Sequence, residues 1–131
     1  MDHVSLTLNL SFDDAIDAVT AALGDEGFGV ITRVDMHTTF KTKLGVDMAP
    51  YTILGACNPK LAHTAVTAVP EIGLLLPCNI TVEADGDVTR IRIPNAREML
   101  GGAGLSDAPE LAELAEDAGQ RLERVATALQ G

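Results

Sequence analysis

The segment from Cys78 to Ile93 constrains the fold most, because it encodes a tight antiparallel hairpin. In residues 78–84, apolar and polar side chains alternate, which is the pattern of a half-buried strand. A second strand pattern occupies residues 88–93, and Asp85-Gly86-Asp87 lies between the two. An Asp-Gly pair tolerates the positive φ values that such a turn requires. The sequence therefore predicts an antiparallel sheet built around this hairpin.

The first part of the chain predicts a strand, a helix and a second strand. Residues 4–10 alternate as an amphipathic strand, and Ser11 to Asp14 form a capping box for a helix that ends at Gly24 or Gly27. The strand at residues 28–36 follows. We expect its inner face to carry Phe28, Val30, Val34 and Met36. A short helical turn, capped by Thr38 or Thr39 and closed by Gly45, comes next.

The remaining patterns complete the predicted order β-α-β-β-α-β-β-α. An apolar strand ends near Cys57, and a helix capped by Asn58 runs from Pro59 until Pro70 ends it. A long amphipathic helix, capped by Asp107 with Glu110, closes the chain. We predict one domain, with residues 1–100 as its α+β body and residues 101–131 as a glycine-rich flexible joint and the C-terminal helix.

Length and charge restrict the function. A chain of 131 residues is long enough for one domain with a real core. The net charge of −10, with nine Lys and Arg in total, argues against nucleic acid as a partner, because phosphate binding needs clustered cations. The acidity promotes solubility, and a salt-rich cytoplasm is an alternative origin. We expect a cytoplasmic protein with no membrane partner, because the sequence has neither a signal peptide nor a membrane span.

Two cysteines are the most unusual residues, and each is followed directly by asparagine. Cys57 precedes a predicted helix N-terminus, where exposed amides and the helix dipole favour a thiolate. Cys78 begins a predicted strand. If the strand that ends at Cys57 and the strand that begins at Cys78 are neighbours, the two thiols lie at the same edge of the sheet. In the cytoplasm such a pair is expected to be reduced.

The candidate ligand-binding residues are therefore Cys57, Asn58, Cys78 and Asn79. A soft metal ion is the candidate cofactor, with Cys57, Cys78 and His37 as its candidate ligands. The structural alternative is that both cysteines are small buried side chains at strand ends and that both asparagines satisfy backbone groups. His63 is expected to face solvent.

Four motifs carry a resemblance to a known family. The segments GFGVITRVD, LGACNP and GLLLPCN, followed by the short acidic hairpin, resemble the family called domain of unknown function 302, in its subgroup with cysteine at both marked places. The resemblance implies a small α+β domain with helices on one face of a curved antiparallel sheet, similar to the TATA-binding-protein architecture. It also implies a homodimer, and it implies no established activity.

Three hypotheses for function remain open. The first is a homodimeric binding module for a small ligand or soft metal ion at the Cys57/Cys78 site. The second is a thiol-based redox enzyme or sulfur carrier with Cys57 as the nucleophile. The third is a structural or interaction protein with inert cysteines. The sequence contains no GxSxG, GxGxxG, Walker A or HExxH motif, which favours a binding module over an enzyme.

Overall fold

The structure is a computed structural model that describes residues 2–101 and 104–131. The elements follow one another as β1 (His3–Leu8), α1 (Phe12–Asp25), β2 (Gly29–Asp35), α2 (Met36–Leu44), β3 (Tyr51–Cys57), α3 (Pro59–Ala68), the 3-10 helix η1 (Pro70–Leu75), β4 (Cys78–Asp85), β5 (Val88–Pro94), α4 (Ala96–Gly101) and α5 (Pro109–Gln130). The predicted glycine-rich joint falls partly on residues 102–103, which lie outside the described residues.

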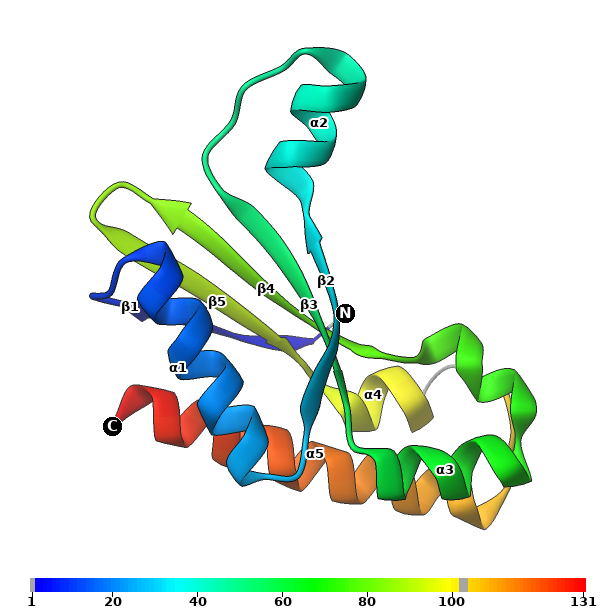
Figure 1. Ribbon diagram of the computed structural model, residues 1–131. Coiled ribbons are helices and arrows are strands. Elements are labelled where there is room, and N and C mark those ends of the chain that lie inside the picture. The colour runs from blue at the N-terminus through cyan, green and yellow to red at the C-terminus, as the bar shows by residue number, and fades with distance from the viewer. Residues whose placement is uncertain (1, 102–103) are drawn as a thin grey trace.

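A five-stranded antiparallel sheet organises the fold, with the strand order β1-β5-β4-β3-β2 (Figure 1). The predicted hairpin joins β4 and β5, and Gly86 at its turn has a φ of 61°. Glycine suits this turn because it adopts positive φ without a steric cost. The predicted α+β class with an antiparallel sheet is confirmed.

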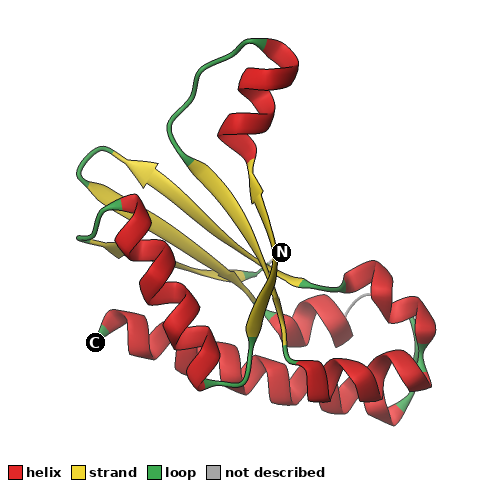
Figure 2. Ribbon diagram, viewed as in Figure 1, coloured by secondary structure: helices red, strands yellow, loops and turns green. Residues whose placement is uncertain are grey.

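The core lies between one face of the sheet and the helices α1 and α5. The alternating pattern of β4 and β5 places Ile80, Val82, Ile91 and Ile93 on this face, where each is at most 1% exposed. Helix α1 contacts β2, β4 and β5, and α5 contacts α1 and β1 (Figure 2). The apolar stripe of α5 thus covers the core of its own chain, as its spacing indicated.

The order predicted from the sequence omits the short helices η1 and α4, and α2 was predicted only as a short helical turn. Helix α2 is longer than the predicted turn, because it begins directly after β2 at Met36. Its cap residue is Asp35 rather than Thr38 or Thr39, and Thr39 instead donates a hydrogen bond from Oγ1 to the Asp35 carbonyl oxygen. Gly45 ends α2 in the left-handed conformation, as predicted.

The predicted inner face of the second strand is wrong in part. Phe28 is buried, but Val34 is 43% exposed. A bulge shifts the pairing of β2 with β3 between Val30 and Thr32. Because side chains alternate along a strand, one inserted residue reverses the face of every residue that follows. The periodicity before the bulge therefore does not extend to Val34.

The predicted helix caps have mixed outcomes. The Asp14 backbone N–H donates to Ser11 Oγ at 3.2 Å, which confirms the cap of α1, and Gly27 follows α1 with a φ of 84°. The predicted Asp107 cap is wrong. Helix α5 begins at Pro109, and among the described residues no side chain caps its N-terminus. Proline at the first helical position has no N–H to satisfy, which reduces the need for a cap.

No helix within the described residues is both long and apolar enough to cross a bilayer.

Candidate functional site

The two thiols come from neighbouring strands. In the β3–β4 ladder Cys78 pairs with Ala56, so Cys57 is one residue beyond the partner of Cys78. Strand spacing places the two Cα atoms roughly 6 Å apart. Cys78 is buried, Cys57 is half-buried, and both are free thiols. Two positions 21 residues apart in the sequence therefore share one end of the sheet.

Both cysteines line one small cavity at this end of the sheet. The helices α3, α4 and α5 and the segments before β2 and β4 supply its apolar walls, which include Phe28, Leu61, Leu76, Leu100, Leu114 and Ala118. The cavity has a free volume of about 10 Å³. That volume holds about one water molecule or one ion. The free space therefore matches a single ion or water molecule.

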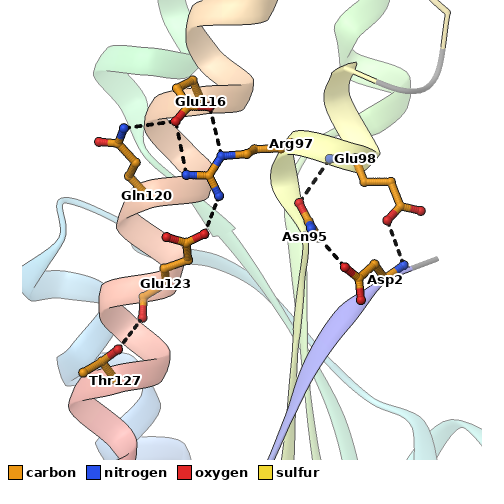
Figure 3. Close-up of polar contacts among 8 residues, drawn as sticks. All are labelled: Asp2, Asn95, Arg97, Glu98, Glu116, Gln120, Glu123 and Thr127. Carbon is orange, nitrogen blue, oxygen red and sulfur yellow. Dashed lines mark hydrogen bonds and ion pairs between the residues drawn. The ribbon is translucent and has the colours of Figure 1, made fainter.

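Arg97 holds one wall of the cavity in place. Its guanidinium joins α4 to α5 through ion pairs with Glu116, at 2.9 Å, and with Glu123 (Figure 3). A Cβ at residue 119 would lie 2.8 Å from Arg97 Cγ, so Gly119 provides the room for this side chain to lie along α5. These contacts fix α4, which contributes Leu100 to the cavity, against α5, which contributes Leu114 and Ala118.

Asn58 lines the same cavity and has a structural role that the sequence predicted. Its Oδ1 accepts a hydrogen bond from the Leu61 backbone N–H at 3.3 Å, which caps α3. Pro59 occupies the first turn of the helix. Asn58 also lies against the turn before β2, because a Cβ on Gly27 would be 2.9 Å from Asn58 Nδ2.

Two other predicted site residues lie away from the thiols. Asn79 is exposed, because it follows Cys78 on β4 and so points to the opposite face of the sheet. His37 lies beside Tyr51, and its Nδ1 is 3.0 Å from the Tyr51 backbone nitrogen. Tyr51 and Cys57 are at opposite ends of β3, roughly 20 Å apart. His63 is exposed on α3, as expected.

The described residues 2–101 and 104–131 contain no group of three or more His, Cys, Asp or Glu side chains that could hold a metal ion. A metal ion bound between the thiols would therefore have two ligands from this chain. Two ligands are too few for a structural zinc site, because such sites almost always use four.

Comparison with known proteins identifies the family. Residues 4–129 match the family described as domain of unknown function DUF302. The chain belongs to this family. A crystal structure of an uncharacterized conserved DUF302 protein from Bacillus stearothermophilus is similar over 98% of each chain, with 27% sequence identity and a TM-score of 0.83. No curated protein matches the chain.

The Cys57 thiol of this DUF302 chain is less acidic than the sequence predicted. Burial raises the pKa of Cys57, which opposes the lowering expected at a helix N-terminus. Burial also raises the pKa of Cys78 to about 11, and the nearby Cys57 adds to this shift. The interior therefore favours the neutral thiol at both positions. A low-pKa nucleophile at Cys57 does not follow from this environment.

We expect Asn58→Ala to lower the free energy of unfolding by about 1 kcal/mol, because it removes the cap of α3. Urea denaturation measures the change. Asn58→Ser is the matched variant, since serine also caps helices, and it should retain most of the stability. Equal losses in both variants would contradict a capping role.

The sequence did not identify the residues that form the walls of the cavity. Leu100, Leu114 and Ala118 belong to helical apolar stripes whose spacing indicates burial. The pattern does not indicate which segment a stripe covers. Only the three-dimensional arrangement of α3, α4 and α5 brings them to the thiols.

Proposed function

We propose that this DUF302 domain is a homodimeric binding module that holds one soft metal ion between Cys57 and Cys78. The observation that carries the proposal is the shared cavity: two free thiols line a space of about 10 Å³. A bare ion fits such a space. The homodimer is the assembly that the family resemblance implies.

The donor set favours copper(I). Thiolates are soft ligands that select copper(I) and similar ions. A site with two thiols and apolar walls offers few ligands, and a soft monovalent ion tolerates a low number of ligands better than a hard cation does. Each thiol must lose its proton on binding, so binding releases two protons and strengthens as the pH rises. Because the pKa of Cys78 is raised to about 11, this strengthening continues into the alkaline range.

A titration with copper(I) under anaerobic conditions, in competition with a chromogenic copper(I) chelator, tests the proposal. We expect one ion per chain for the wild type. Cys57→Ser and Cys78→Ser should each lower the affinity by about 100-fold or more, because even residues behind the ligands change metal affinity by 10–100-fold. His63→Ala is the control, since His63 is exposed on α3 and lies outside the cavity.

Two results would reject the metal site. One is a wild-type protein that does not compete with the chelator. The other is a serine variant that binds copper as tightly as the wild type.

A thiol pair that cycles between dithiol and disulfide is the second candidate function. Two observations favour it: the Cα separation of roughly 6 Å is within the range that disulfides span, and both thiols line one cavity. Forming the bond removes two protons and two electrons, so a cellular disulfide or peroxide must act as the oxidant. Mass spectrometry after treatment with oxidised glutathione measures the outcome. A loss of two hydrogens in the wild type supports the redox pair, and free thiols throughout the treatment reject it.

A further inference from the structure

Helix α2 and the loop after it, residues 36–50, form an arm that projects past the end of the sheet (Figure 1). None of the nine residues of α2, all of which the structure describes, is buried. The arm also exposes large apolar side chains: Leu44 is 69% exposed, Val46 50% and Met48 43%. A segment with this composition is expected to find its apolar contacts outside its own domain.

Strand β2, which leads into the arm, is an edge of the sheet. Ile31 is 60% exposed and Val34 is 43% exposed. Together with the arm, β2 contains five of the nine large apolar side chains that are exposed among the described residues. Arg33 and Asp35 form an ion pair on β2, and a bulge lies between Val30 and Thr32, two features that moderate the reactivity of an edge. The exposed apolar side chains Ile31 and Val34 remain available to a partner on this free edge.

The accessible surface of the chain is larger than that of a compact monomer of the same mass, which supports an interface with a partner. The accessible surface is 7150 Å², whereas a compact monomer of this mass has about 6,600 Å². The excess of roughly 500 Å² approaches the 800 Å² that one partner buries in a stable interface.

We propose that β2 pairs with β2 of a second copy of this chain, antiparallel across a two-fold axis, and that each arm then docks on the partner. A symmetric interface between identical edge strands pairs the same surface with itself. The Asp35 end of one strand then meets the Gly29 end of the other, so each arm lies beyond Gly29 of the partner. Gly29 pairs with Cys57 in β3, so the docked arm lies next to the thiol cavity.

Charge complementarity selects this position for the arm. The chain has three lysines, and the arm holds two of them, Lys41 and Lys43. Lys41 pairs with Asp47 at 2.9 Å, while Lys43 has no ion pair with any described residue. At the receiving end, Glu26 is already bound by Arg121 and Arg124 of α5, whereas Asp25, the last residue of α1, has no ion pair with any described residue. Anions are unfavourable at a helix C-terminus, so a lysine from the partner would stabilise Asp25 there.

The other edge strand of the sheet, β1, lacks the exposed apolar side chains of β2. Helix α5 contacts β1, and Val4, at 39%, is the only large apolar side chain of β1, a strand described in full, that is exposed. The β1 edge therefore offers less apolar surface for a second copy than β2 and the arm do.

Sedimentation equilibrium of the full chain tests the interface. We expect a wild-type mass of twice 13.7 kDa, and a monomer for Ile31→Lys, because a charge on the edge opposes strand pairing. Leu74→Lys is the control, since Leu74 is 80% exposed on η1, and it should remain a dimer. Circular dichroism verifies that each variant is folded. A monomeric wild type, or a folded Ile31→Lys dimer, would overturn the proposal.

A charge exchange tests the docking of the arm. We expect Lys43→Glu to weaken dimerisation by about tenfold, and Asp25→Lys in the same chain to restore it. Loss without restoration, or no loss, would overturn the docking of the arm on α1. The proposal depends on the homodimer and not on the metal site: a monomeric wild type that still binds copper would reject the interface alone, and a dimer that binds no copper would reject the metal site alone.

Discussion

Gly55→Ala should lower the free energy of unfolding by about 3 kcal/mol, because β3 has no room for a side chain at this position. A Cβ on Gly55 would lie 1.9 Å from Thr32 Oγ1 and 2.7 Å from Pro77 Cγ. Pro77 belongs to the segment that leads into Cys78, so the added methyl group would also disturb the approach of β4 to β3. Urea denaturation measures the loss.

Gly29→Ala is the matched control for this prediction. Gly29 is also a strand glycine, and its added Cβ would meet no described atom within 4 Å. Thr32→Ala in the Gly55→Ala chain should recover part of the stability, because it removes the shortest contact and leaves the contact with Pro77. Equal stability of Gly55→Ala and Gly29→Ala would contradict the close packing of Thr32, Gly55 and Pro77.

Stability should fall by about 2 kcal/mol between pH 9 and pH 11 because of Cys78 alone. Burial and the nearby Cys57 raise the pKa of Cys78 from 9.0 to about 11 in the folded chain. Below pH 9 the thiol is protonated in both the folded and the unfolded state, so its contribution is constant. As the pH rises through this window, the unfolded chain releases the proton more readily, and the folded state loses stability.

Cys78→Ala isolates this effect, because it removes the titrating group and leaves the other alkaline groups in place. We expect its free energy of unfolding to depend less steeply on pH between 9 and 11 than that of the wild type. Cys57→Ser should retain most of the wild-type slope, since burial is the larger cause of the shift at Cys78. Parallel pH profiles for the wild type and Cys78→Ala would show that Cys78 is not buried as described.

Local sequence patterns predicted the parts of the fold that depend on local chemistry. The Asp-Gly turn, the Ser11 cap and the Asn58 cap each depend on one residue type at a fixed offset, and the structure confirms all three. The exposure of Val34 could not be predicted in this way. It depends on a bulge in the pairing of β2 with β3, which the sequence of β2 alone does not encode.

The candidate site was also predicted only in the features that depend on local patterns. The positions of Cys57 at a strand end and Cys78 at a strand start follow from local patterns. Their proximity depends on β3 and β4 being neighbours, and their raised pKa values depend on burial by α3, α4 and α5. The sequence suggested His37 as a third ligand because histidine binds metals, but the sheet separates His37 from Cys57 by the length of β3.

X-ray absorption at the copper edge of the copper(I)-loaded protein tests the central claim most directly, because it counts the atoms that surround the ion. We predict two sulfur neighbours and no nitrogen neighbour, supplied by Cys57 and Cys78. A copper ion surrounded by nitrogen or oxygen atoms, or by a single sulfur, would contradict a shared site for the two thiols.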